Sequence, residues 1–179
     1  MQPMVRPSSC PSHIIDLGVR AALWCAYHIL LAWWFVRRPN HYGTVVAIWV
    51  GPRILMIRHS YRYNWLSWPG GSIHRGEKPA EAARRELKEE TGLDIAAGSL
   101  RFIGEVLERW EWRYDYVSLF ELKLKRAPEL RLDGREVIGA ALMSPKAALA
   151  QPLVPFIRNY LENRTRPGRR RHRASVNDF

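Results

Sequence analysis

The segment that most constrains this chain is Gly71–Leu93, in which a glycine-containing loop leads into a helix with three glutamates. Its second half, PAEAARRELKEET over residues 79–91, begins with a proline, which is favourable in the first turn of a helix. Gly92 follows directly and is a typical helix stop. Alanine and leucine side chains three and four residues apart give this segment one apolar stripe. The spacing therefore predicts a helix over residues 79–91 that packs on a folded domain.

Three carboxylates in this predicted helix share one face, because Glu86, Glu89 and Glu90 stand at positions i, i+3 and i+4. Like charges at these offsets repel by a few tenths of a kcal/mol per pair. A divalent cation among the carboxylates would offset that repulsion, and oxygen ligands of this kind favour Mg²⁺ or Mn²⁺ over zinc. The alternative is an ordinary solvent-facing helix whose glutamates are balanced by neighbouring arginine and lysine side chains.

The loop before the helix contains two adjacent glycines, Gly70 and Gly71, which follow Trp68 and Pro69. Glycine lets the backbone turn sharply and approach a ligand closely. Carbonyl or amide groups of such a loop can face a metal ion or a phosphate. A loop of this composition alone indicates only a turn, but its combination with the three glutamates favours a site.

These residues together resemble the signature of the Nudix hydrolase family, G-x5-E-x7-R-E-U-x-E-E-x-G-U, in which U is aliphatic. Seven of its positions each require a single residue type, and chance agreement at a given start is on the order of 10⁻⁸. Outside the signature, the order of strands and helices resembles the family from about Tyr42 to Leu161. The matching residues are Gly71, Glu77, Arg85, Glu86, Leu87, Glu89, Glu90, Gly92 and Leu93.

The resemblance implies the family's fold and chemistry. The fold would be of the α/β class, an α/β/α sandwich around a mixed β-sheet, here preceded by an N-terminal apolar helix. The activity would be Mg²⁺- or Mn²⁺-dependent hydrolysis of a pyrophosphate bond in a nucleoside diphosphate-linked or nucleoside triphosphate substrate. The alternative is a module that binds or senses a nucleotide without turnover. Family members that lose catalysis commonly lose these glutamates, and this chain keeps all of them.

The resemblance also implies a set of metal ligands. The side chains of Glu86, Glu89 and Glu90 would bind the cation, with Glu86 and Glu90 the strongest candidates. The backbone carbonyl of Gly70 would be a further ligand. Glu77 and Arg85 would form an ion pair that holds the loop against the helix and orients the ligands.

The catalytic base is less closely defined, because it varies within the family and often lies outside the signature. The candidate catalytic residues are Glu90, Glu89 and Glu136, the last at the position that other members use. Asp133 and Glu129 are nearby alternatives to Glu136. For Glu136 the competing interpretation is an exposed charge at the edge of a strand.

The sequence does not define the group that carries the diphosphate. Arg58 and Arg62 are candidate phosphate contacts, and Trp110 is a candidate for stacking on a base. All three have a structural alternative, as loop arginines or as an aromatic residue in a hairpin. The sequence suggests no partner for His59 or His74, and a zinc site is not expected.

Strand signals surround the predicted helix. Apolar and β-branched runs at residues 44–50 and 53–58 flank Gly51-Pro52, and further runs cover 101–111, 114–124 and 136–143. Ser144-Pro145 has the form of an N-cap followed by a first-turn proline, which predicts helix toward Leu161. We therefore divide the chain into an N-terminal apolar segment over 1–40, a catalytic domain over 41–162 and a basic tail over 163–179.

The net charge of +11 is concentrated at the two ends of the chain. Leu17–Val36 is nearly free of charge and is followed by Arg37 and Arg38. It is long enough to be a helix packed on the domain, a helix lying in a membrane interface, or a membrane span. The tail, Asn163–Phe179, contains six arginines and no hydrophobic periodicity, which predicts disorder.

These ends suggest partners beyond the substrate. An anionic membrane surface is one candidate partner of the apolar helix and the basic tail. Contact of the tail with nucleic acid, a purely solubilising tail and a homodimer also stay open. With 47% hydrophobic residues the chain is not globally disordered, and two cysteines are too few for a disulfide scaffold. We expect a cytoplasmic, reduced setting, with membrane association an open alternative.

Overall fold

A mixed seven-stranded sheet forms the centre of the computed structural model, which describes residues 13–62, 64–96 and 98–165. Five of the strands lie in the order β3-β2-β1-β6-β5, with β4 beside β1 and β7 beside β2. The α/β sandwich expected from the sequence is confirmed. The strands are β1 (Asn40–Val50), β2 (Arg53–His59), β3 (Leu66–Ser67), β4 (Gly70–Ser72), β5 (Arg101–Trp110), β6 (Arg113–Leu124) and β7 (Val137–Met143).

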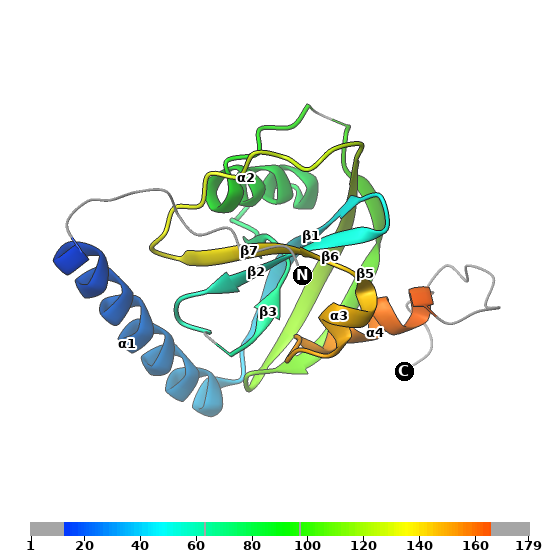
Figure 1. Ribbon diagram of the computed structural model, residues 1–179. Helices are drawn as coiled ribbons and strands as arrows, with labels where there is room; N and C mark the ends of the chain where they lie inside the picture. The colour runs from blue at the N-terminus through cyan, green and yellow to red at the C-terminus, as the bar shows by residue number, and fades with distance from the viewer. Residues whose placement is uncertain (1–12, 63, 97, 166–179) are drawn as a thin grey trace.

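Helices cover both faces of this sheet (Figure 1). Helix α2 (Pro79–Thr91) lies on one face, and α3 (Pro145–Leu149) and α4 (Pro155–Thr165) lie on the other. Helix α2 has the bounds predicted from its proline and Gly92, and Gly92 ends it in a left-handed conformation with φ of 73°. Ser144 caps α3 by accepting a hydrogen bond from the Ala147 amide, as its sequence predicts.

The hydrophobic core has two layers because the side chains of β1 and β2 alternate between the faces of the sheet. On the α2 side, Ala83 and Leu87 pack against strand residues such as Ile48. On the α4 side, Ile157 and Leu161 pack in a cluster that includes the buried Trp68. This packing fixes α2, and with it the glutamates, against the sheet.

The glycine loop joins the sheet as strand β4, which pairs with the part of β1 that β2 leaves unpaired. Strand β1 pairs with β6 in parallel along its whole length, but it pairs with β2 only near the hairpin at Val50 and Arg53. Strand β4 occupies the free end of β1, where Gly70 and Gly71 pair with Val45 and Thr44. A Cβ atom at Gly70 would lie 2.1 Å from the Thr44 carbonyl oxygen, so only glycine fits there.

Helix α1 (His13–Arg37) confirms the N-terminal apolar helix and lies to one side of the sandwich (Figure 1). The start predicted for the basic tail was wrong, because α4 continues to Thr165. Arg164 is held there by Glu121 of β6, and the Thr165 hydroxyl donates to the Leu161 carbonyl. The prediction of disorder for the rest of the tail, residues 166–179, lies outside the described residues.

Candidate active site

Glu90 is buried in the last turn of α2, where two groups fix its carboxylate. Its Oε1 lies 2.7 Å from Nε2 of His59 at the end of β2. Its Oε2 accepts a hydrogen bond of 2.8 Å from the Gly70 amide. The glycine loop therefore touches Glu90 through its backbone N–H, whereas the role of the Gly70 carbonyl as a metal ligand stays a prediction.

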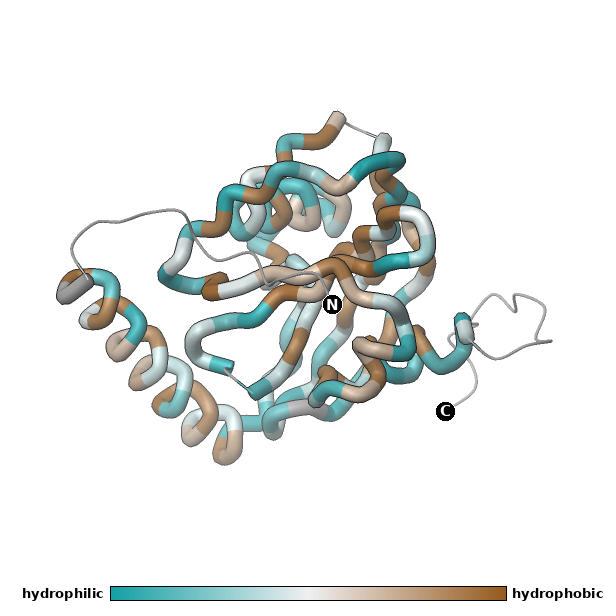
Figure 2. Tube along the Cα trace, in the orientation of Figure 1, coloured by the Kyte–Doolittle hydropathy of each residue, from teal (hydrophilic) through white to brown (hydrophobic). Residues whose placement is uncertain are grey.

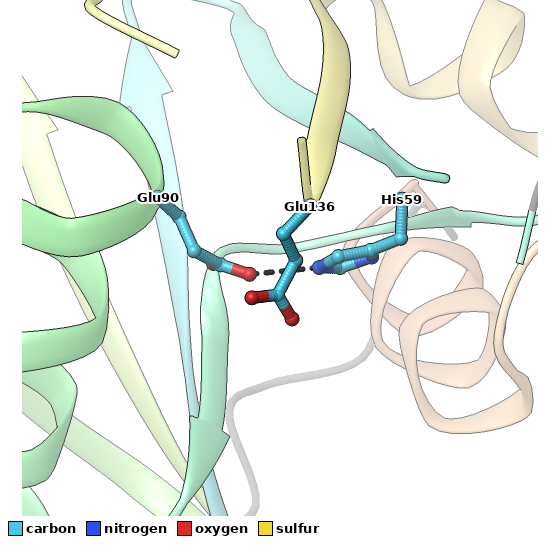
Figure 3. A group of neighbouring side chains, drawn as sticks. All are labelled: His59, Glu90 and Glu136. Atoms are coloured by element: carbon cyan, nitrogen blue, oxygen red, sulfur yellow. Dashed lines mark hydrogen bonds and ion pairs between the residues drawn. The ribbon is translucent and has the colours of Figure 1, made fainter. Parts of the chain in front are cut away.

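Glu136 brings a second carboxylate to this place from the residue before β7. Figure 3 shows the side chains of Glu136, Glu90 and His59 pointing toward one another. Each offers a ligand atom, and these atoms all lie within 4.8 Å of one another. The Tyr61 hydroxyl donates to Glu136 Oε1 at 3.2 Å, and the Asp133 carboxylate accepts from the Glu136 amide, which orients the segment before β7.

Glu86 lies one turn before Glu90 and faces the second glycine of the loop. A Cβ atom at Gly71 would come within 2.6 Å of the Glu86 carboxylate, so the bare glycine leaves the room that this side chain occupies. Glu89 differs from the other two glutamates because its side chain is 59% exposed and accepts a hydrogen bond from Arg85. The helix therefore turns Glu86 and Glu90 toward the loop and leaves Glu89 at the rim.

The acidic cluster, formed by Glu86, Glu90 and Glu136, brings three carboxylates together at one place. Burial raises the pKa of all three carboxyls, because a charge in a poorly solvated place is unfavourable. Each also raises the pKa of a neighbour in the cluster by repulsion, while His59 lowers that of Glu90. Buried or half-buried oxygen donors that repel one another fit a small divalent cation such as Mg²⁺ or Mn²⁺.

Arg85 joins the loop to the helix. Its guanidinium forms a bidentate ion pair with Glu77, with both N–O distances 3.0 Å, and also donates to the Ser72 carbonyl. The hydrogen bonds from Arg85 lower the pKa of Glu77 to about 2, so Glu77 is ionised at neutral pH. Arg85 also donates to Glu86 Oε1 at 2.7 Å, and it therefore links the Glu77 loop to a member of the acidic cluster.

A cavity of about 370 Å³ opens beside the glycine loop, and α1 forms part of its wall. Gly70, Gly71 and His59 line it from the side of the acidic cluster. Leucine, tyrosine and tryptophan side chains of α1 line it from the other side, including Tyr27 and Trp34. The mixture of an apolar wall with a few polar groups is typical of a ligand-binding pocket.

A hydrogen-bonded histidine and an ion-paired arginine extend the polar side of this cavity. His41 Nδ1 lies 2.7 Å from Asp115 Oδ1, and His41 Nε2 lies 2.9 Å from the Ser72 hydroxyl. Arg113, at 2.8 Å from the same Asp115 oxygen, stacks over the Trp34 ring at 4.1 Å. These contacts join strands β1, β4 and β6 to α1 around the cavity.

The candidate substrate contacts have different surroundings. Arg62 lines the cavity, but it forms an ion pair with Glu111 and stacks on Tyr27, so it has a structural role as well. Arg58 lies in β2, on the strand that ends at His59. Trp110 ends β5, and its side chain is not among those described. Substrate binding by these three residues stays a prediction.

His59 was missed by the sequence analysis, which found no partner for either histidine. His59 is hydrogen-bonded to Glu90, and His74 lies 3.8 Å from Glu77. Because His59 and Glu90 are 31 positions apart on different elements, no local spacing could indicate their contact. Tyr61 and the α1 wall of the cavity were missed for the same reason.

Comparison with known proteins shows the family to which the chain is similar. A family model described as the NUDIX domain matches residues 39–163. An RNA pyrophosphohydrolase of Bartonella clarridgeiae is 41% identical over 71 residues, which are 38% of this chain and 38% of that protein. One from Bartonella bacilliformis is 46% identical over 48 residues, 26% of this chain and 28% of that protein. The match therefore spans less than half the length of either relative.

Solved structures show the same fold at low sequence identity. The dihydroneopterin triphosphate pyrophosphohydrolase of E. coli superposes with a TM-score of 0.59 at 23% identity, covering 68% of this chain and 92% of that one. The MutT protein of Methanosarcina mazei Go1 gives a TM-score of 0.61 at 21% identity, covering 70% and 93%. At these identities the likeness supports the fold of the sandwich.

Proposed function

The chain belongs to the NUDIX family, and on that premise we propose that it is a divalent-cation-dependent pyrophosphohydrolase of nucleotide-type substrates. The observation that carries this proposal is the contact of Glu90 and Glu86 with Gly70 and Gly71, because the same two glycines line the cavity. Glu86 and Glu90 would hold the cation beside Glu136, and Mg²⁺ or Mn²⁺ suits their oxygen donors. When bound, such a cation neutralises diphosphate oxygens and makes water more acidic.

The residues of the chain supply orientation and a base. Arg85 and Glu77 hold the loop on α2, and the Gly70 amide fixes one oxygen of Glu90. We assign the base role to Glu136, whose pKa is raised by burial and by repulsion from Glu90. A carboxylate with a raised pKa accepts a proton from an attacking water more readily than an ordinary one. Burial also raises the pKa of Tyr61, so its hydroxyl stays protonated and keeps Glu136 oriented.

The substrate is expected to combine a diphosphate with a group that fits an apolar and aromatic wall. The diphosphate would lie toward Gly70 and Gly71, and the attached group toward Tyr27 and Trp34 of α1. A nucleoside base meets that requirement because aromatic rings stack on it. Since the Bartonella relatives are named RNA pyrophosphohydrolases, RNA carrying a 5′-terminal pyrophosphate is included among the substrates we propose.

The test is a substrate panel read by phosphate and pyrophosphate release with Mg²⁺, Mn²⁺ or EDTA. The panel contains nucleoside triphosphates, nucleoside diphosphate derivatives and 5′-triphosphorylated RNA. We expect cleavage of at least one compound with Mg²⁺ or Mn²⁺, and a loss of at least 100-fold in Glu90→Gln, because a charged ligand is removed while the shape is kept.

Glu105→Gln is the matched control, because it makes the same chemical change at an exposed residue of β5, outside the acidic cluster. Circular dichroism should show that both variants are folded. Binding of a nucleotide without any turnover would contradict the proposal and favour a sensing module. Equal activity of the two variants would remove Glu90 from the mechanism.

A further inference from the structure

Helix α1 exposes an apolar surface that the domain does not cover. It contains the one stretch among the described residues that is long and apolar enough to cross a membrane by length and composition, Ile15–Arg37. Figure 2 shows hydrophobic residues recurring along the helix. Ile29 is 70% exposed and Val36 is 76% exposed. We call the outer face of α1 the surface formed by Ile15, Ile29, Trp33 and Val36, which are exposed and share one side of the helix.

The outer face carries no Asp, Glu, Lys or Arg. Between Ile15 and Val36 the only such residues are Asp16 and Arg20, and both are directed to the domain. Arg20 donates two hydrogen bonds to the Gly134 carbonyl, and Asp16 lies 3.2 Å from Arg135. An apolar surface of this size is rare on a protein that meets only water.

The inner side of α1 is held by specific contacts, so the direction of the outer face is fixed. The Tyr27 hydroxyl donates to Glu111, and Phe35 packs edge-on against Trp112 with ring centroids 4.9 Å apart. Glu111 and Trp112 form the β5–β6 turn, and both have positive φ values, 52° and 65°. Backbone strain of this kind persists only where surrounding contacts hold it. The turn and α1 therefore support each other.

We propose that the outer face of α1 docks on an anionic lipid surface. Tryptophan and aliphatic side chains on one side of a helix suit the interface of a bilayer. Arg37 and Arg38 are exposed at the end of the same helix, where they meet lipid headgroups. The net charge of +11 favours an anionic membrane over a second copy of the chain, because two copies repel each other.

The contacts of α1 place it on the membrane surface rather than across it. A spanning helix would have to leave the domain and break the contacts of Arg20, Tyr27 and Trp34. An interfacial helix keeps all of them while burying its outer face. Because the inner side of α1 lines the cavity, docking holds the cavity next to the bilayer.

The test is co-sedimentation of the full chain with vesicles of phosphatidylcholine, with or without phosphatidylglycerol. We expect binding to the anionic vesicles and weaker binding in high salt, because salt screens the arginine contribution. Ile29→Asp or Trp33→Asp should weaken binding at least tenfold, since a charge enters the apolar face. Arg37→Gln and Arg38→Gln should each weaken it about fivefold.

Leu107→Asp is the matched control, because Leu107 is 54% exposed, close to the 51% of Trp33, but lies on β5. This variant should bind the vesicles like the wild type. Sedimentation velocity without vesicles tests whether a second copy of the chain covers the outer face instead. A dimer that Ile29→Asp converts to monomers, with no binding to vesicles, would overturn the proposal in favour of a second copy. Binding that resists both high salt and alkaline carbonate would overturn it in favour of a span.

Discussion

At the scale of single residues, the acidic cluster makes cation binding depend on pH. Burial and mutual repulsion raise the pKa of Glu86, Glu90 and Glu136, so the folded state binds protons more tightly than the unfolded state. Without a cation, these groups stabilise the fold at acid pH, and that contribution is lost as the pH rises through the raised pKa values. A cation competes with the same protons.

We therefore predict that Mg²⁺ stabilises the protein more at neutral than at acid pH. The measurement is the thermal midpoint with Mg²⁺ minus the midpoint with EDTA, at about pH 5 and about pH 8. The difference should be larger at the higher pH, where the three carboxylates are ionised. In Glu90→Gln the difference in thermal midpoint should be small at both pH values. An equal Mg²⁺ effect at the two pH values would contradict the raised pKa values.

The second glycine of the loop gives a sharper test of local geometry. In Gly71→Ala the new methyl group would lie 2.6 Å from the Glu86 carboxylate, which must move. We expect Mg²⁺ affinity and kcat/KM to fall about tenfold or more, with little change in thermal stability. Gly18→Ala is the control, because nothing lies within 4 Å of its new methyl group. Unchanged kinetics in Gly71→Ala would show that the position of Glu86 is unimportant.

The sequence predicted those site residues that are close together along the chain. Glu86 and Glu90 are one helical turn apart, so their spacing alone places them on one face. The exposure of Glu89 could not be predicted, because it depends on where the sheet meets α2. Glu136 was named only through the family resemblance, and His59 was missed. The long-range pairing of β2 with β7 brings both residues to Glu90.

At the scale of elements, the two sides of α1 have different functions. Two adjacent tryptophans, one on each side, allow these functions to be tested separately. Trp34 lines the cavity and lies under Arg113, whereas Trp33 belongs to the outer face. We predict that Trp34→Ala raises KM about tenfold with a smaller effect on kcat, because it removes a wall that binds substrate and not the acidic cluster. Kinetics in solution without lipid are the measurement.

Trp33→Ala is the matched control and should leave these solution kinetics unchanged. Mg²⁺ affinity should be the same in both variants and in the wild type. If Trp34→Ala behaves like Trp33→Ala in KM, α1 is not part of the substrate-binding cavity.

Helix α4 is tied to the sheet by one buried carboxylate. The Glu121 side chain is only 1% exposed and accepts hydrogen bonds from Arg101, Tyr160 and Arg164. These hydrogen bonds lower its pKa against the opposing effect of burial. We predict that Glu121→Gln lowers the free energy of unfolding by about 2–3 kcal/mol, measured by urea denaturation.

The control for this change is Glu162→Gln, on the more exposed side of the same helix. It should change the free energy of unfolding by less than about 0.5 kcal/mol. Comparable losses in both variants would show that the Glu121 interactions do not hold α4 in place.

The elements themselves were predictable where the local signals are strong. Helix α2 has a proline at its start and a glycine at its end, and its predicted bounds agree with the structure. Strands β3 and β4 were missed, because two or three residues with adjacent glycines give no alternation to detect. They form only because β2 diverges from β1 and leaves backbone groups of β1 to be paired.

At the scale of the whole molecule, the chain combines a NUDIX sandwich with an amphiphilic helix at the mouth of its cavity. The sequence predicted both parts, because each has its own composition and periodicity. It did not predict that they share the cavity, since that contact joins residues more than 80 positions apart, such as Tyr27 and Glu111. The sequence left open whether α1 packs on the domain or lies in a membrane interface. Both are compatible, because its inner side packs on the domain and its outer face is free to dock on lipid.

The central claim is that the acidic cluster binds a divalent cation, and titration with Mn²⁺ followed by electron paramagnetic resonance tests it most directly. The account predicts saturable binding of Mn²⁺ to the wild type, displaced by Mg²⁺, and at least tenfold weaker binding in Glu86→Gln and Glu90→Gln. Glu105→Gln, an exposed residue of β5, should bind like the wild type. Absence of saturable Mn²⁺ binding to the folded wild type, or equal affinity in all the variants, would contradict the account.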